Sequence, residues 1–137
     1  MHMNLAIREL GGMTDELEAK LKRHRIRKSD QLLNAARTPA ARHDLAKAMG
    51  VDESVILELA NRADLARVKG IGQVFADLLE QAGVDSVKEL ANRRPDTLHI
   101  RLIEVNTQKR VAWRAPDLRS VENWIAQAKQ LPKILEY

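Results

Sequence analysis

The residues with the clearest potential for chemistry are two glycines on either side of a β-branched residue, Gly70-Ile71-Gly72. They follow Lys69 and precede an amphipathic segment that begins at Gln73. Glycine lacks a Cβ, so it can adopt a positive φ and lets another backbone or a phosphate group approach closely. The first N–H groups of a helix have no intrahelical acceptor and lie at the positive end of the helix dipole. Gly70, Gly72 and Gln73 could therefore donate to a phosphate oxygen beside the charge of Lys69, while Ile71 would anchor the turn in the core.

This turn has a predicted helix on each side. Asp64 is expected to cap a short helix over residues 65–68, and a longer amphipathic helix follows the glycines. Together they resemble the helix-hairpin-helix unit. The resemblance implies a site that holds the sugar-phosphate backbone and contacts no base edges, so that binding is independent of sequence and falls as salt rises. A Gly-Ile-Gly turn can equally serve as a tight corner between packed helices, with no ligand.

The densest positive charge lies in residues 20–28, which contain six Lys or Arg and no acidic residue. These cations are Lys20, Lys22, Arg23, Arg25, Arg27 and Lys28. They could hold phosphate groups through side-chain charge, or they could form a solvated surface, because cations are also favoured at a helix C-terminus. A looser group is interpreted as a solvated connector: Lys109, Arg110, Arg114 and Arg119.

Composition and charge limit the class of protein. The chain has 137 residues, 45% of them hydrophobic, which is enough for a buried core. Its net charge of +4 permits an anionic partner without requiring one. The absence of cysteine excludes disulfides and thiolate metal sites and suits a reducing compartment. No apolar run approaches the roughly 20 residues of a membrane span, and residues 1–4 lack the features of a signal peptide. We therefore expect a cytoplasmic protein without membrane contact.

The sequence contains no recognisable pattern for catalysis. The histidines are distant from one another and lack the spacing of metal ligands: His2, His24, His43 and His99. The segment after Gly70 lacks the Lys and Ser/Thr of a phosphate-binding loop and the third glycine of a dinucleotide fold. We expect no enzyme activity, no metal, no cofactor and no small-molecule substrate.

Glycines and prolines divide the rest of the chain into helical segments, and no segment alternates apolar and polar residues over the length of a strand. Helix starts are predicted at or beside Thr14, Ser29, Thr38-Pro39, Asp52, Ser86, Pro95 and Pro116-Asp117, and helix ends at Gly50 and Gly83. The fold is therefore predicted to be an all-α, compact bundle of about eight to ten short helices.

An internal repeat appears when the chain is shifted by 58 residues. The shift places Gly12 on Gly70, Met13 on Ile71, Leu17 on Phe75, Leu21 on Leu79 and Ile26 on Val84. After one inserted residue, Leu33 falls on Leu90. Thr14 stands where the second copy has Gly72, so we expect two helix-hairpin-helix units of which the first is degenerate.

Several segments beyond the hairpin are similar to a bacterial family known as domain of unknown function 4332. They are residues 61–72, 78–80, 82–85, 104–106 and 124–129. The family is built from tandem helix-hairpin-helix units, and the resemblance covers nearly the whole chain. It implies one integrated domain over residues 1–137, with the first unit at about 5–63, the second at about 64–107, and a connector with a C-terminal helix at 108–137. Members carry Gly-Ile-Gly in the first unit too, where this chain has Gly12-Met13-Thr14, so no phosphate binding is expected there.

The function that these features favour is non-enzymatic, sequence-independent binding to a nucleic-acid backbone through residues 69–73, assisted by residues 20–28. Aromatic residues are few, and Phe75 and Trp124 fall on apolar stripes, which favours duplex DNA over stacked single strands. The alternative is a protein-interaction or self-association module in which the hairpins are purely structural.

Overall fold

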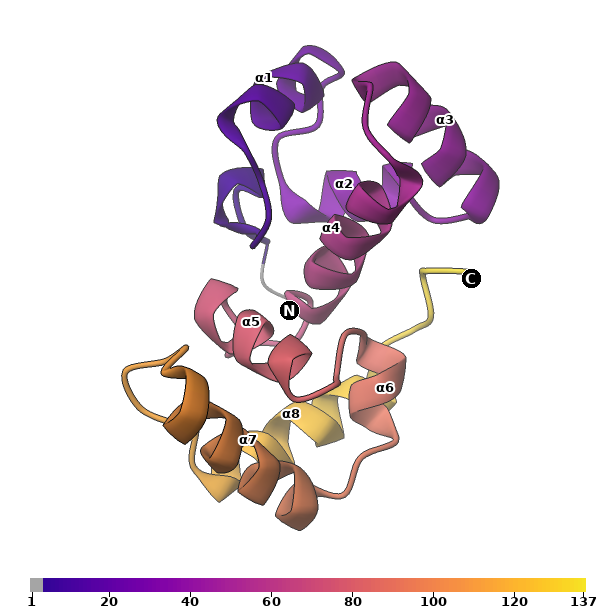
Figure 1. Cartoon of the computed structure of the whole chain (residues 1–137). Helices are drawn as coiled ribbons and strands as arrows, with labels where there is room; N and C mark the ends of the chain where they lie inside the picture. The colour runs from indigo at the N-terminus through magenta and orange to yellow at the C-terminus, as the bar shows by residue number, and fades with distance from the viewer. Residues whose placement is uncertain (1–3) are drawn as a thin grey trace.

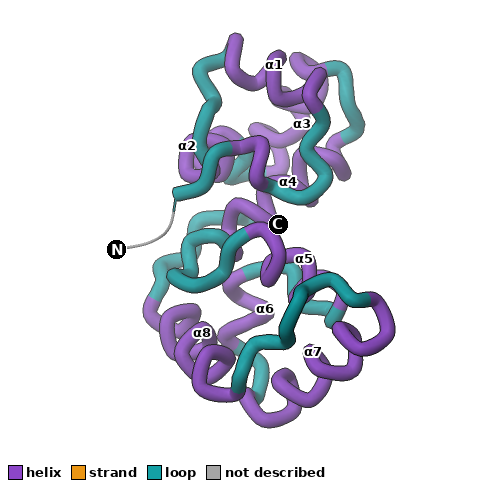
Figure 2. The backbone as a smooth tube through the Cα atoms, turned by 90° about the vertical axis from the view of Figure 1, so that its left-hand side faces the viewer, coloured by secondary structure: helices purple, strands orange, loops and turns teal. Residues whose placement is uncertain are grey.

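The computed structural model describes residues 4–137, so the expectations for residues 1–3, including His2, lie outside the described residues. Residues 4–137 contain eight α-helices, one short 3-10 helix and no strand (Figures 1 and 2). In chain order they are η1 (Ile7–Glu9), α1 (Asp15–Arg23), α2 (Ser29–Ala35), α3 (Pro39–Met49), α4 (Glu53–Leu65), α5 (Gln73–Gln81), α6 (Val87–Ala91), α7 (Pro95–Lys109) and α8 (Leu118–Gln130). The predicted all-α class is confirmed.

Side-chain caps begin four of these helices at the predicted residues. In each case the side-chain oxygen of the cap accepts the backbone N–H three residues ahead, at 2.8–3.2 Å. The pairs, with the acceptor first, are Thr14 and Leu17, Thr38 and Ala41, Ser86 and Glu89, and Asp117 and Ser120. Gly50 ends α3 with a φ of +71°, in the left-handed region that glycine adopts without strain. Local capping chemistry therefore sets these five helix boundaries.

Helix α2 begins at Ser29 as predicted, but neither Ser29 nor Asp64 caps a helix, because both side chains are used in tertiary contacts. Ser29 is the first residue of α2, and its hydroxyl accepts from the Leu5 N–H (2.9 Å) and donates to the Asn4 side chain (3.2 Å). Asp64 lies in the last turn of α4, which runs without a break to Leu65. Its carboxylate is buried and accepts from the Val87 N–H at 2.9 Å.

The helices form two structural repeats, residues 7–64 and 65–130. A shift of 58 residues places α1 on α5 with identical bounds. A shift of 65 places α4 on α8, which have the same length of 13 residues. In the first repeat α2 and α3 pack on α4, and in the second α6 and α7 pack on α8 in the same way (Figure 1).

One detail of the predicted repeat is wrong. The Leu32 N–H donates to the Lys28 carbonyl, as the Leu90 N–H does to the Ser86 carbonyl. Leu32 therefore corresponds to Leu90, no residue is inserted before α2, and the shift of 58 continues through the second helix of each repeat.

Each repeat buries its own hydrophobic core. The first core includes Leu17, Leu21, Leu32, Ile56 and Leu59. The second includes Ile71, Leu79, Leu90, Val121 and Ile125. The prediction of one integrated domain stays a prediction, but several features join the repeats. They include the continuous helix α4, the ion pairs of Arg62 with Asp77 and Glu80 of α5, the hydrogen bond from the Val87 N–H to Asp64, and the C-terminal tail.

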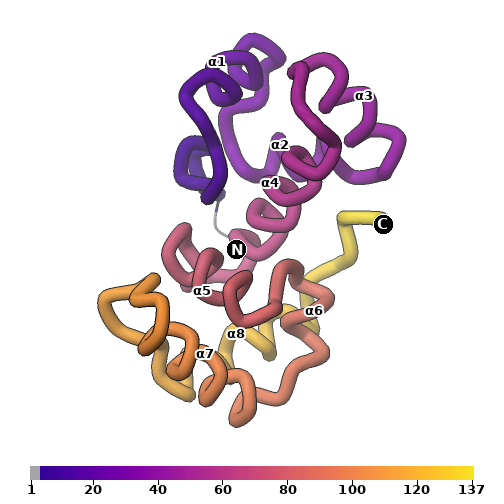
Figure 3. The backbone as a smooth tube through the Cα atoms, in the orientation of Figure 1, coloured from indigo at the N-terminus to yellow at the C-terminus, as the bar shows by residue number. Residues whose placement is uncertain are grey.

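The C-terminal tail, residues 131–137, runs from the end of α8 back to the first repeat (Figure 3). Leu135 is 3% exposed and belongs to the first core. The Glu136 N–H donates to the Arg37 carbonyl at 2.8 Å, and Arg42 donates to the Glu136 carbonyl at 2.7 Å. The Tyr137 hydroxyl donates to Asn61 at 2.6 Å. The tail is therefore an extended segment that connects the end of the second repeat to the first core.

Candidate functional site

The second hairpin turn, residues 68–72, has the backbone geometry that its glycines predict. Gly70 has a φ of +102°, and the Ile71 N–H closes the turn on the Val68 carbonyl at 3.1 Å. Ile71 is fully buried, as expected for the anchor of the turn. Lys69 and Gln73 are exposed, and Gln73 is the first residue of α5. The structure thus brings these five predicted residues together on one turn.

Helix α8 holds this turn in place. The Lys69 N–H donates to Gln127 Oε1 at 2.8 Å, and Gln127 Nε2 donates back to the Lys69 carbonyl at 2.9 Å. Gly70 lies against Trp124, since a Cβ at this position would stand 2.9 Å from the indole Nε1. Sequence reasoning assigned neither Gln127 nor Trp124 to the site, because the contacts join residues more than 50 positions apart.

The first hairpin turn, residues 10–14, docks on its own repeat in the corresponding manner. Gly12 has a φ of +90°, and a Cβ there would meet Leu59, which corresponds to Trp124 under the shift of 65 residues. A Cβ on Gly11 would collide with Arg62, which corresponds to Gln127. Both turns therefore lie on the fourth helix of their repeat at equivalent positions.

The two hairpins differ at the start of the helix that follows. Thr14 caps α1 by accepting the Leu17 N–H, whereas Gly72 has no side chain to cap α5. Within residues 4–137 the N–H groups of the first turn of α5 have no hydrogen-bond acceptor: these are Gln73, Val74 and Phe75. A Cβ on Gly72 would meet no atom within 4 Å, so the space in front of Gly72 is open. These N–H groups can donate to an external anion, whereas in the first hairpin Thr14 already accepts the Leu17 N–H, which corresponds to the Phe75 N–H.

The second hairpin turn and the glycines of the first also lie within the part of the chain that matches a known family. Residues 11–131 match the model of the family described as domain of unknown function (DUF4332). The chain belongs to the DUF4332 family. No curated protein and no solved structure matches the chain. The family match covers all eight α-helices and ends at the first residue of the C-terminal tail.

A groove of about 710 Å³ in this DUF4332 chain runs beside the second hairpin, between Lys69 and α8. Arg119 lines the groove, although its sequence position suggested a solvated connector. Asp117 lies in the same groove, and the backbone N–H of Ser120 holds the pKa of its carboxyl below the usual value. The groove therefore has two cations and one ionised carboxylate, together with the polar side chains of Asn123 and Gln127.

The basic cluster, residues 20–28, divides into two kinds of cation. Lys20 pairs with Glu16 at 3.3 Å and Lys22 with Glu18 at 3.0 Å. Four cations are exposed and have no ion pair within residues 4–137: Arg23, Arg25, Arg27 and Lys28. Arg25 has a φ of +65°, at the position where the second repeat has Gly83 with a φ of +90°. The free positive charge is therefore smaller than the sequence count of six.

The basic cluster and the second hairpin belong to different repeats (Figure 1). No hydrogen bond or ion pair among the described residues joins them. In residues 4–137 no group of three or more His, Asp or Glu side chains is arranged to hold a metal ion, and no helix is long and apolar enough to cross a membrane. The structure thus separates the two predicted binding elements instead of merging them into one site.

Proposed function

We propose that the chain binds the sugar-phosphate backbone of nucleic acid, most readily duplex DNA, without sequence preference and without catalysis. The second hairpin would act as a helix-hairpin-helix unit. The observation that carries the proposal is the uncapped first turn of α5 beside Lys69. Three backbone donors at the positive end of a helix dipole, open to solvent at a glycine, suit a phosphate oxygen.

The first hairpin supports the proposal by contrast. It has the same docking on its repeat, but Thr14 already satisfies the N–H of Leu17. A phosphate at that turn would have to displace a side-chain cap, so we assign binding to the second hairpin alone. Lys69 and Arg119 would add charge beside it, and the unpaired cations of residues 20–28 would contribute at a longer range.

The test compares two Asp substitutions at equivalent positions of the two repeats. Gly72→Asp gives α5 an anionic cap that occupies the Phe75 N–H and repels phosphate, whereas Thr14→Asp only exchanges one cap for another. Both variants lower the net charge by the same amount. Fluorescence anisotropy with labelled duplex DNA, single-stranded DNA and RNA is measured at about 50 mM salt, where phosphate contacts are strongest.

We expect Gly72→Asp to weaken duplex binding by about tenfold or more, on the scale of one charged hydrogen bond, and Thr14→Asp by less than about twofold. Circular dichroism and thermal unfolding of both variants establish that the fold is kept. The proposal is wrong if the wild-type chain binds none of the three nucleic acids, or if the two variants lose affinity equally.

A protein-interaction module is the second candidate function, and exposed apolar side chains favour it. Ile100 and Ile103 on α7 are about half exposed, and Trp113 in the following connector is fully exposed. Large exposed apolar side chains often mark contact surfaces between proteins. Sedimentation velocity over a range of concentrations tests self-association, with Trp113→Ser as the variant expected to keep the chain monomeric.

A further inference from the structure

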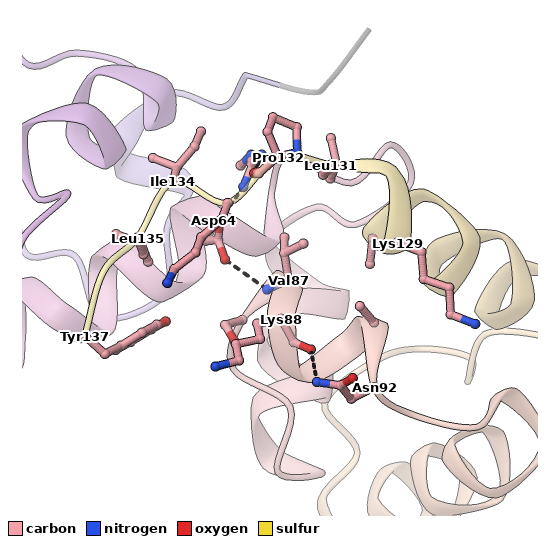
Figure 4. A pocket seen from close by; sticks show the side chains of 15 residues that line it. Asp64, Val87, Lys88, Asn92, Lys129, Leu131, Pro132, Ile134, Leu135 and Tyr137 are labelled. Carbon is pink, nitrogen blue, oxygen red and sulfur yellow. Dashed lines mark hydrogen bonds and ion pairs between the residues drawn. The ribbon is translucent and has the colours of Figure 1, made fainter.

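A second cavity, of about 520 Å³, lies between α6, α8 and the C-terminal tail (Figure 4). It shares no lining residue with the groove beside the second hairpin. Its volume is in the range of pockets that hold small organic molecules. The tail forms one wall, so the cavity depends on how residues 131–137 pass over α6 and the end of α4.

Much of the cavity wall is apolar. Val87 and Ala91 come from α6, Ala128 from α8, and Leu131 and Ile134 from the tail. Figure 4 shows the side chains of Val87, Leu131 and Ile134 around the same space. Such a wall suits the hydrocarbon part of a ligand, because burying apolar surface there is favourable.

A buried arginine gives the cavity a polar end. Arg67 is 5% exposed and lines the cavity. Its Nη1 donates to Asp64 Oδ1 at 2.8 Å, and its Nη2 donates to the Pro132 carbonyl of the tail. Among the residues that the structure describes, its Nε is a buried polar atom without a hydrogen-bond partner. A buried donor without an acceptor is costly, and native proteins seldom tolerate one without a reason.

The geometry of the guanidinium indicates what would satisfy this donor. Nε and Nη2 lie on one edge of the planar group and can donate two parallel hydrogen bonds to a single carboxylate. The Pro132 carbonyl accepts from Nη2 and leaves Nε unused. Asp64 is committed elsewhere, since its second oxygen accepts the Val87 N–H.

The charges around the cavity favour an anion. Four cationic side chains line it against one carboxylate side chain: Arg67, Lys88, Lys129 and Lys133 against Asp64. The three lysines are exposed and have no ion pair within residues 4–137. Since Asp64 is neutralised by Arg67, the uncompensated charge facing a ligand is positive.

We propose that this cavity binds a small amphipathic carboxylate, such as a medium-chain fatty acid. Its hydrocarbon part lies against Val87, Ala91 and Ala128, and its carboxylate takes the Nε and Nη2 edge of Arg67 in place of the Pro132 carbonyl. Lys88, Lys129 and Lys133 attract the anion to the cavity. Binding at this site is independent of the nucleic-acid function proposed above.

Isothermal titration calorimetry with three probes tests the chemistry of the ligand. Octanoate has both the chain and the charge, octanol has the chain without the charge, and acetate has the charge without the chain. We expect saturable binding of octanoate, with octanol and acetate weaker by about tenfold or more.

Two tryptophan substitutions test the location. Ala91→Trp fills the cavity, and Ala126→Trp places the same side chain on the exposed face of α8 as a matched control. Arg67→Lys keeps the charge but removes the two-donor edge. We expect Ala91→Trp and Arg67→Lys to weaken octanoate binding by about tenfold or more and Ala126→Trp to leave it unchanged.

Thermal unfolding of each variant separates loss of binding from loss of the fold, and Ala91→Trp keeps the test valid if Arg67→Lys does not fold. The proposal is overturned by octanol binding as tightly as octanoate, by non-saturable adsorption of octanoate, or by wild-type affinity in a folded Ala91→Trp variant. Each of these results would mean that the cavity is not a carboxylate site.

Discussion

Gly70 and Trp124 meet so closely that a Cβ on the glycine would stand 2.9 Å from the indole nitrogen. The same position of the first repeat pairs Gly12 with the smaller Leu59, whose side chain would lie 4.0 Å from a Cβ on that glycine. The ring of Trp124 also contacts Phe75, with ring centroids 5.2 Å apart. The second hairpin is therefore fixed between the first turn of α5 and the middle of α8. Glycine is required at position 70 both by the close packing against Trp124 and by the positive φ.

Gly70→Ala is accordingly expected to destabilise the fold by about 2 kcal/mol or more, because alanine is strained at a positive φ and its Cβ would collide with the Trp124 ring. Gly72→Ala is the control. Its φ of −92° suits any residue, and nothing lies within 4 Å of the added carbon, so a change within about 0.5 kcal/mol is expected. Urea unfolding measures both variants, and equal losses would contradict this account of the turn.

The paired hydrogen bonds of Gln127 lead to a second prediction. Gln127→Ala removes one acceptor and one donor from the backbone of Lys69, and we expect the free energy of unfolding to fall by about 1–2 kcal/mol. Gln130→Ala, at the exposed end of the same helix, should change it by less than about 0.5 kcal/mol. Amide hydrogen exchange at Lys69 should accelerate in the first variant alone, and unchanged exchange there would show that α8 does not hold the turn.

Much of the second hairpin could be predicted from the sequence, because glycine spacing and caps are local signals and the shift of 58 residues is visible in the sequence itself. Its support could not, since Gln127 and Trp124 lie more than 50 residues away. The sequence predicts a helix cap at Asp64, which the structure does not form, for a related reason. An Asp before an apolar run resembles a cap, and its distant partner, the Val87 N–H, depends on how α6 packs.

Part of the pairing in the basic cluster follows from residue spacing in the sequence. Glu16 and Glu18 precede Lys20 and Lys22 by four residues, the spacing that joins side chains along one helix face. Counting those pairs would have reduced the expected free charge from six cations to four. The exposure of the other four cations could not be obtained from charge spacing alone.

The left-handed backbone of Arg25 allows a stabilising substitution. Its φ of +65° is strained for a residue with a Cβ, and the equivalent residue of the second repeat is Gly83. We expect Arg25→Gly to raise the free energy of unfolding by about 0.5–1 kcal/mol, after allowance for the greater entropy of glycine in the unfolded chain. Arg23→Gly removes the same charge from the last turn of α1, where φ is helical, and should lower the free energy of unfolding by about 1 kcal/mol. Thermal unfolding gives the sign of each change, and a loss in both variants would contradict the assignment of strain to Arg25.

The tail should stabilise the first repeat although it follows the second. Leu135→Ala opens a cavity in the first core, and we expect it to lower the free energy of unfolding by about 2–4 kcal/mol. Lys133→Ala, two residues earlier and exposed, should have an effect below about 0.5 kcal/mol. Urea unfolding followed by circular dichroism measures the difference, and a small effect of Leu135→Ala would mean that the first core closes without the tail.

The salt dependence of binding distinguishes the contributions of the two basic elements. If residues 20–28 touch phosphate groups, replacing Arg23, Arg27 and Lys28 by Gln removes up to three counterion-releasing contacts and flattens the dependence of log K on log salt by about 0.9 per contact on duplex DNA. Gly72→Asp should instead weaken binding at every salt concentration through the hairpin. Because Lys20 and Lys22 are already paired with glutamates, replacing them should alter the slope less than replacing Arg23 and Arg27. A slope that is the same in the triple variant and in the wild type, measured by anisotropy between about 50 and 200 mM salt, would show that residues 20–28 form a solvated surface and that the hairpin binds without them.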